Sequence, residues 1–416
     1  MRMKVFGFPA LGLIGLGGIS SLGAACGGGD TEKILPPPMT TAQAGSSSMQ
    51  GESGGGAGGS VMSAPCPSYT PDRCGDGAAS KCVSLQSDAE HCGSCDHACP
   101  AQAACSAGVC TPVPEELTMS AGCGELRLSL QGERLFWNEP KTGRIRSISV
   151  SGGAVAELAS KQLNPGHVVT DDANAYWFTT GDGTSGSSAL LKVSLSGVAS
   201  EPVVLKAAPG TDPINGLALA GGKLLYGLVH DVHALSLDVV DGTDEIVGVA
   251  VARNDTRIPT GIPNALTVHG DRVYWIVTDV GSVECDDFLP GDAGLTRVAH
   301  GGEMWPNDLG FAGDFTYFAA ADSLYAAQMN VPATAVASTS DATIGPFAVV
   351  DMTAYFSDAS GRILQHGVEL PTGEPTPPLP LARDQGQVTS VVADATHVYW
   401  ASVATDGACS IHRLAR

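Results

Sequence analysis

Three stretches of the sequence share one pattern: HVVTDDANAYW (residues 167–177), ALTVHGDRVYW (265–275) and SVVADATHVYW (390–400). Each begins with alternating apolar residues, passes through a short run of turn-forming residues and ends on an aromatic pair. Alternation with a period of two, enriched in β-branched and aromatic residues and interrupted by Asp, Asn or Gly, is typical of two strands joined by a tight turn. The pattern therefore predicts a β-hairpin whose second strand carries the aromatic pair.

The same setting recurs seven times over roughly the last 300 residues. The pairs are Phe136-Trp137, Tyr176-Trp177, Leu225-Tyr226, Tyr274-Trp275, Tyr317-Phe318, Tyr355-Phe356 and Tyr399-Trp400. Their second residues lie 40, 49, 49, 43, 38 and 44 positions apart, a period that indicates a propeller or a solenoid. A third alternating run follows each pair, as in GRIRSISVSGG and ALLKVSLSG, and a fourth fits before the next unit. Four strands per unit predict an all-β chain built as a β-propeller.

These units resemble the YWTD/NHL class of propeller, in which an inner strand and a tight turn precede an aromatic pair. The Thr-Asp that completes the family motif is absent from nearly every unit, and Phe or Tyr replaces several of the Trp residues. The aromatics are interpreted as packing residues between blades. The recurrent turn aspartates, Asp172, Asp271 and Asp394, are interpreted as hairpin residues rather than catalytic acids.

Seven pairs predict seven blades, and six is the alternative if the long third or fourth unit is irregular. The last unit lacks an outer strand, whereas the segment EELTMSAGC at 115–123 is strand-like and unclaimed. An N-terminal strand that completes the last blade would remove an exposed sheet edge. Antiparallel pairing would then place Cys123 beside Cys409, within disulfide reach. Cys285 would remain as a free thiol in a long loop of the fourth blade.

The N-terminus has the pattern of a secretory signal peptide, with Arg2 and Lys4 followed by an apolar stretch and small residues. Cys26 follows Leu22-Gly23-Ala24-Ala25, which resembles the lipobox of bacterial lipoproteins. That resemblance implies a lipid-anchored outer-membrane protein, with plain secretion after Ala25 as the alternative. We expect a signal peptide at 1–25, a Gly/Ser/Pro tether at 26–65, a disulfide-rich module at 66–111 and the propeller at 112–416.

Eight cysteines crowd the module: Cys66, Cys74, Cys82, Cys92, Cys95, Cys99, Cys105 and Cys110. In an exported protein an even number at this density predicts four disulfides, because so short a segment lacks an apolar core. A zinc site at Cys92, Cys95 and Cys99 with His91 and His97 is the alternative. The segment 82–110 resembles the cysteine-rich repeat of the stigma-specific protein family, and His91 and His97 are interpreted as exposed loop residues.

Charge and motifs exclude several functions. The formal charge is −21, or −23 once Arg2 and Lys4 are removed, and no Lys/Arg cluster exists, so no nucleic-acid partner is expected. Hydrolase elbows, phosphate-binding loops and zinc-protease motifs are absent. We therefore expect no catalytic residue, no cofactor and no metal. Asp286, Asp287 and Asp292 crowd one loop, and a calcium site there is the less favoured interpretation.

Asn and Pro recur where the inner strands begin, at one mouth of the propeller. The candidate ligand-binding residues are Asn164, His167, Asn215, Asn264, Trp305 and Asn307. Turn capping is the competing role for the Asn residues. The sequence predicts a non-catalytic binding or scaffolding lipoprotein of the cell envelope, with a protein or glycan ligand at the mouth. A propeller hydrolase or lyase with a divalent metal is the alternative, and a mouth of mostly Asn and Pro disfavours it.

Overall fold

The computed structural model describes residues 66–75, 80–99, 103–181, 188–196, 201–207, 214–228, 231–237, 244–249, 263–277, 282–287, 296–300, 308–328, 333–339, 342–368 and 377–416. In these ranges every regular element is a β-strand. Among the same residues there is no helix of the length and hydrophobicity needed to cross a membrane.

Seven four-stranded antiparallel sheets make up most of the described chain, one for each aromatic pair. Blade 1 is β6 (Leu128–Gln131), β7 (Arg134–Glu139), β8 (Arg144–Ser149) and β9 (Ala156–Ala159). Blade 2 is β10 (Pro165–Thr170), β11 (Asn174–Thr179), β12 (Ala189–Ser194) and β13 (Val203–Ala207). Blade 3 is β14 (Ile214–Ala220), β15 (Lys223–Leu228), β16 (Asp231–Ser236) and β17 (Asp244–Val249). Blade 4 is β18 (Pro263–His269), β19 (Arg272–Val277), β20 (Ser282–Asp287) and β21 (Thr296–His300).

The remaining three blades follow the same order until the last. Blade 5 is β22 (Leu309–Ala312), β23 (Phe315–Ala320), β24 (Ser323–Ala327) and β25 (Thr334–Ser338). Blade 6 is β26 (Ile344–Val350), β27 (Thr353–Asp358), β28 (Ile363–Gly367) and β29 (Leu379–Ala382). Blade 7 is β30 (Gln387–Ala393), β31 (His397–Val403), β32 (Ala408–Ala415) and β5 (Glu115–Ala121).

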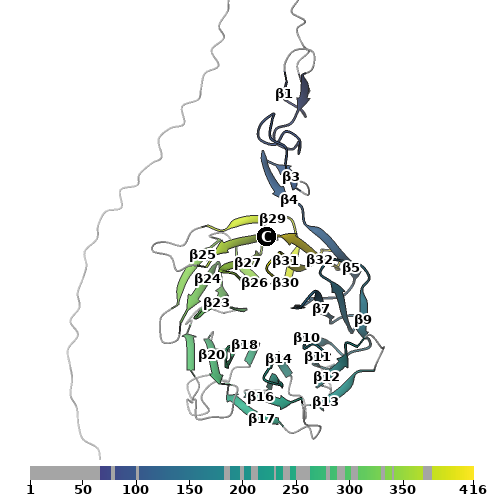
Figure 1. Cartoon of the computed structure of the whole chain (residues 1–416), viewed down its shortest axis with the longest axis vertical. Helices are drawn as coiled ribbons and strands as arrows, with labels where there is room; N and C mark the ends of the chain where they lie inside the picture. The colour runs from purple at the N-terminus through teal and green to yellow at the C-terminus, as the bar shows by residue number, and fades with distance from the viewer. Residues whose placement is uncertain are drawn as a thin grey trace, which may run out of the picture. The chain divides into compact units, whose positions relative to one another are not determined.

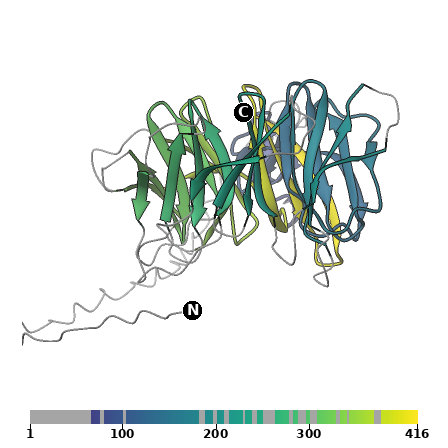
Figure 2. The ribbon, with the colours of Figure 1, turned by 90° about the horizontal axis from the view of Figure 1, so that it is seen from below.

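The blades are arranged in a ring around one axis, with the first strand of each blade innermost (Figure 1). Inner strands of successive blades contact one another around the ring, including β30 of blade 7 with β6 of blade 1. The strands run between two faces of the ring, as the perpendicular view shows (Figure 2). We call the face where the inner strands begin the start face, and the face of the turns that join inner and second strands the hairpin face. The predicted all-β propeller is confirmed.

The aromatic pairs lie on the second strands and are buried between blades, as predicted. Trp137, Trp177, Trp275 and Trp400 are each at most 1 % exposed. Three of the second residues stack on their direct partners across the second and third strands: Tyr226 on His233, Phe318 on Tyr325 and Trp400 on His412. Ring stacking across a strand pair adds to the stabilisation from buried area.

The hairpin turns are capped by aspartate, although blade 2 uses a different residue from the one predicted. Asp394 accepts hydrogen bonds from the backbone N–H groups of Thr396 and His397 and from the Tyr399 hydroxyl. In blade 2 the corresponding residue is Asp171, which accepts from the backbone of Ala173 and Asn174 and from Tyr176. Asp172, the predicted turn residue, lies in the same turn, and its neighbour Asp171 is the residue that caps it.

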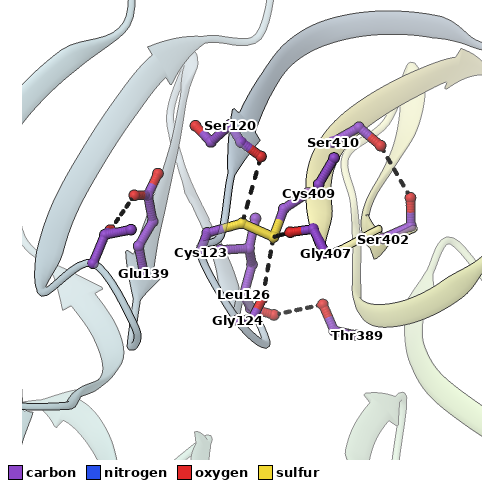
Figure 3. Close-up of a disulfide and its surroundings, with 12 residues drawn as sticks. Ser120, Cys123, Gly124, Leu126, Glu139, Thr389, Ser402, Gly407, Cys409 and Ser410 are labelled. Carbon is purple, nitrogen blue, oxygen red and sulfur yellow. Dashed lines mark hydrogen bonds between the residues drawn. A yellow bond between two sulfur atoms is a disulfide. The ribbon is translucent and has the colours of Figure 1, made fainter. Parts of the chain in front are cut away.

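Closure of the ring follows the predicted strand order. β5 pairs with β32 in the register Ala121–Ala408 and Ser120–Cys409, so a strand from the start of the propeller completes its last blade. Cys123 and Cys409 form a disulfide with their α-carbons 6.3 Å apart, inside the usual range. Figure 3 shows this bridge together with the hydrogen bond from Thr389 to the Leu126 carbonyl, which joins blade 7 to the entry of blade 1.

The cysteine-rich module contains two small hairpins, β1 (Asp72–Cys74) with β2 (Lys81–Val83) and β3 (Ala103–Ser106) with β4 (Val109–Pro112). Its eight cysteines form four disulfides: Cys66–Cys82, Cys74–Cys95, Cys92–Cys105 and Cys99–Cys110. The sulfurs of Cys92, Cys99 and Cys110 lie within 4.8 Å of one another. Each is consumed in a disulfide, and a zinc ligand has to be a thiolate.

The two histidines of the module have local structural roles. His91 Nδ1 bonds to the carbonyl of Cys95 at 2.6 Å, and His97 Nδ1 bonds to the carbonyl of Cys92 at 2.9 Å. His97 is exposed and His91 is half-buried. Both rings therefore fix the turns around the disulfides.

The fourth blade differs from expectation at its acidic segment. Cys285, Asp286 and Asp287 were predicted to lie in a loop, but they belong to strand β20, opposite Tyr274, Val273 and Arg272. The alternation of residues with a period of two continues through SVECDD. Pairing with β19 makes this segment a strand. The state of the Cys285 thiol and the position of Asp292 lie outside the described residues, so the free thiol stays a prediction.

Candidate functional site

The inner strands are irregular at the start face. The register of β10, β14, β18, β26 and β30 shifts within their first residues, at Pro165/Val168, Asn215/Leu217, Asn264/Thr267, Ile344/Phe347 and Val388/Ser390. A bulge bends a strand and redirects one side chain, and bulges are concentrated beside functional sites. Five of the blades thus have an irregular inner strand at the same face.

Close approach of neighbouring strands explains two glycines in these bulges. A Cβ on Gly166 would lie 2.1 Å from the Phe178 ring. Gly216 has a φ of +64°, and a Cβ there would lie 2.6 Å from a Leu266 methyl of the next blade. Only glycine has both the conformational range and the space for the second position.

The structure brings some of the predicted ligand-binding residues together at the inner strands. His167 lies on β10 and Asn215 on β14, both half-buried. Asn264 lies on β18, but only its backbone is described. Asn164 is exposed with a φ of +48°, and its amide donates to the Thr180 hydroxyl, so it caps a turn.

Trp305 and Asn307 lie outside the described residues. Their assignment to the ligand site stays a prediction.

One position recurs in every blade at a fixed distance from the aromatic pair. Ten residues before the second residue of each pair stand Arg127, His167, Gly216, Ala265, Asp308, Pro346 and Ser390. In most blades the next residue pairs directly with that aromatic, as Leu128 does with Trp137, Val168 with Trp177 and Leu309 with Phe318. We call these seven positions the axial ring. Three of its members are ionisable, in blades 1, 2 and 5.

Of the three ionisable members, Arg127 acts electrostatically on the other two. The positive charge of Arg127 adds to the lowering of the His167 pKa by burial and opposes the raising of the Asp308 pKa by burial. Three blades separate blade 5 from blade 1 in one direction and two in the other, and β7 and β23 lie on opposite sides of the ring in Figure 1.

Burial sets the protonation of the two titratable members. Burial is the larger cause that lowers the pKa of His167 to about 4, and the Arg127 charge adds to it. Burial raises the pKa of Asp308, against the opposing effects of Arg127 and of hydrogen bonds from the backbone N–H groups of Leu309 and Phe347. At pH 7 His167 is thus a neutral donor and acceptor, whereas Asp308 is a carboxyl whose charged form is disfavoured by desolvation.

The backbone around Arg127 is held from three directions. Its N–H donates to Asn138 Oδ1 at 2.8 Å, and the amide of Asn138 donates to the carbonyl of Pro165 in blade 2 at 2.8 Å. The flanking residues Leu126 and Leu128 bond to hydroxyls of blade 7. The side chain is exposed, and no ion pair found among the described residues includes it. The backbone at Arg127 is thus held in place, and its guanidinium is accessible to solvent.

Arg127 and Asp308 were missed in the sequence because each lies just before the residues of its inner strand that pair with the second strand. The signal that could have found them is the constant offset of ten residues from the aromatic pair. Their presence corrects the expectation that the mouth offers mostly Asn and Pro. Titratable side chains with shifted pKa values do converge there, which is a common property of functional sites.

A depression with a volume of about 340 Å³ lies on the hairpin face. It is shallow and open, between the turns of the first three blades, with Asp171, Asp172 and Lys223 among its lining residues. Asp171 is already used in capping its own turn. The start face is therefore the stronger candidate.

Fold and site together define a β-propeller with ionisable residues around its axis at one face. Among solved structures, virginiamycin B lyase from Staphylococcus aureus is similar in fold, with a TM-score of 0.55 and 10 % identity over 73 % of this chain and 98 % of that one. A streptogramin B lyase has a TM-score of 0.56 and 12 % identity over 72 % and 97 %. The Pan2 WD40 domain of Neurospora crassa has a TM-score of 0.52 and 11 % identity over 72 % and 95 %. At these identities the likeness is one of fold alone.

No family model matches the sequence, and no curated protein matches it.

Proposed function

We propose that this protein is a non-catalytic binding protein of the bacterial cell envelope, which holds a polar ligand over the axis of the start face. The observation that carries the proposal is the placement of Arg127, His167 and Asp308 at equivalent positions of three inner strands. A guanidinium on a fixed backbone, without an ion pair in the described chain, favours recognition of a ligand acceptor group. Asn215 stands next to the axial ring and adds an amide to the proposed site.

The proposed location follows from the disulfides and the N-terminal sequence. Five disulfides are typical of a protein folded in an oxidising compartment. A signal peptide at 1–25 and lipidation of Cys26 would anchor the protein in the outer membrane. The tether at 26–65 would then separate the module and the propeller from the lipid surface, with the membrane as a partner through the lipid alone.

An enzyme of the hydrolase or lyase type, using a divalent metal, is the second candidate. It is favoured by His167 and Asp308, whose pKa values are shifted in opposite directions from their ordinary values at one place. Two of the solved structures of similar fold are named lyases, although fold likeness by itself assigns no reaction.

Binding can be tested by thermal unfolding of the mature chain with a panel of monocarboxylates, amino acids, neutral oligosaccharides and divalent ions. A ligand at a hundred times its Kd stabilises the folded state by about 2.7 kcal/mol. We expect such a shift in the wild type and its loss in Arg127→Gln. Arg134→Gln, at the opposite end of the first hairpin of blade 1, is the control and should keep the shift.

Two results would overturn the proposal. A shift that persists in Arg127→Gln and Asp308→Asn would place the ligand elsewhere. Conversion of the ligand to a product, lost in His167→Gln, would establish the enzyme in place of the binding protein.

A further inference from the structure

An uncharged, apolar surface lies where the cysteine-rich module meets the rim of the propeller. Strand β4 of the module contacts β29, the outer strand of blade 6. Three apolar side chains are largely exposed there: Val109 on β4 at 62 %, Val113 just after β4 at 49 %, and Leu379 on β29 at 63 %. Pro112 and Pro380 are exposed next to them in the sequence. We call these five residues the rim patch.

The rim patch has no charged residue, in contrast to the chain as a whole. The chain has 43 Asp and Glu and 22 Lys and Arg, but the segments 98–114 and 377–382 that carry the patch contain none of them. Val203 and Val204 on β13 of blade 2 are also exposed, at 52 % and 57 %, but that strand carries Lys206 as well. A group of exposed apolar side chains without charges is typical of a surface that is covered in the working state of a protein.

Prolines in the rim patch limit what can cover it. Proline has no backbone N–H and cannot donate a hydrogen bond to an added strand. Pro380 lies within β29 and Pro112 is the last residue of β4, so both edges are poor templates for a strand from another protein. The missing donors also lower the cost of moving this backbone out of water. A partner without a hydrogen-bonding edge is therefore favoured.

The size of the patch favours a membrane over a second protein surface. A stable protein interface takes about 20–30 residues on each side, and the rim patch has five. A weak contact is sufficient for a membrane to which the chain is already anchored, because the anchor raises the local concentration. The proposed lipid site, Cys26, lies 40 residues before Cys66, the first described residue of the module. A tether of that length limits the distance of the patch from the membrane and permits contact.

We infer that the rim patch rests on the surface of a lipid bilayer with zwitterionic headgroups. The inference goes beyond the proposed function, in which the membrane is a partner through the lipid alone. Zwitterionic headgroups are specified because the formal charge of the chain is −21 and the exposed Glu115 and Glu116 follow the patch, so that anionic lipids repel it. Since β29 is an outer strand, the contact is made by the rim and leaves the start face open to a ligand.

The first test is flotation of the unlipidated Cys26→Ser chain with an excess of phosphatidylcholine/phosphatidylethanolamine vesicles. We expect part of the chain to float. Val109→Glu and Leu379→Glu should each lower the partition coefficient about tenfold, because each removes one aliphatic side chain from the contact. Val203→Glu makes the same change on the outer strand of blade 2 and should have no effect. Addition of phosphatidylglycerol should weaken the flotation, and circular dichroism checks the fold of each variant.

The second test uses the anchored chain and locates the contact. Leu379→Trp and Val203→Trp are compared in vesicles that contain brominated phosphatidylcholine, with the fluorescence of the wild type subtracted. The lipid should quench the indole of Leu379→Trp and leave that of Val203→Trp unchanged.

The outcomes separate this inference from the proposed function. Absence of flotation, or flotation that is unchanged in Val109→Glu and Leu379→Glu, would overturn the inference and leave both the anchor and the ligand site standing. Flotation of Cys26→Ser when the wild type carries no lipid would remove the anchor and keep the rim contact. A dimer that forms without vesicles and is lost in Leu379→Glu would assign the patch to a second copy of the chain. Equal quenching of the two introduced indoles would also overturn the inference.

Discussion

Single residues at the start face combine structural and functional constraints. Gly166 leaves room for the Phe178 ring of the second strand, Gly216 allows the inner strand of the next blade to approach, and His167 lies in the same bulge as Gly166 and is held neutral. The hydrogen bonds of Arg127 are made by its backbone and its flanking residues, which leaves the guanidinium outside the packing. We therefore expect that substituting Arg127 changes the charge at this face without removing the hydrogen bonds between the strands.

Replacement of His167 should change how stability depends on pH. Its native pKa, about 4, lies below the ordinary value of 6.5, so the unfolded chain binds the proton more strongly between these values. The stability that the neutral imidazole of His167 contributes is complete above pH 6.5 and falls as the pH is lowered toward 4. Since the side chain is partly exposed, we expect a loss of about 2 kcal/mol between pH 7 and pH 4.5.

Urea unfolding at the two pH values measures this loss. His167→Gln should lose less stability on acidification than the wild type. The loss in Arg127→Gln should lie between these two, because this variant removes the charge of Arg127 but leaves His167 buried. The common loss from Asp394, whose pKa is held near 2 by hydrogen bonds against the opposing effect of burial, cancels in the comparison. Equal losses in wild type and His167→Gln would contradict the assignment.

At the scale of elements, the ring is closed by a strand from outside the repeat. β5 covers the edge of β32, and Arg413 pairs with Glu115 at 2.7 Å near the other end of this contact. An exposed strand edge is a site for non-native pairing. The bridge from Cys123 to Cys409 fixes the same two elements at the start face.

Loss of the closing strand should cost more than loss of the closing disulfide. In the double variant Cys123→Ser/Cys409→Ser, the destabilisation has an upper limit of about 5 kcal/mol from loop-closure entropy. Deletion of residues 112–123 should exceed the loss in that variant, because it removes the β5–β32 hydrogen bonds together with the bridge. Thermal unfolding and light scattering measure stability and edge-driven association. A deletion that is no more costly than the double serine variant would contradict this role of β5.

At the scale of the whole molecule, the disulfide distribution agrees with export. The module has four bridges and little apolar core, with Val83 as its only buried branched aliphatic among the described residues. Such a segment depends on covalent links for its fold. The propeller has its own core in the contacts between blades and needs only one bridge.

We predict that a lipid on Cys26 anchors the whole molecule to the membrane. In a Gram-negative host the wild-type chain should incorporate labelled palmitate and partition into the detergent phase with the outer-membrane fraction. Cys26→Ser should remove the label and release a chain of the same fold into the soluble periplasmic fraction. Membrane association that is unchanged in Cys26→Ser would rule out the lipid anchor.

The sequence by itself determined the fold, the strand that closes it and the crowding of cysteines. These features are local or periodic: alternation, the repeat length and the aromatic pairs can be counted along the chain, and antiparallel pairing then places Cys123 beside Cys409. The offset of ten residues and His167 can be found in the sequence, but the burial and the electrostatic environment of the axial ring were decided only by the tertiary structure. Arg127, His167 and Asp308 are far apart in sequence and lie in different blades, and they meet because seven inner strands converge on one axis. The pKa shifts of His167 and Asp308 depend on burial and on the charge of Arg127, neither of which has a local signature.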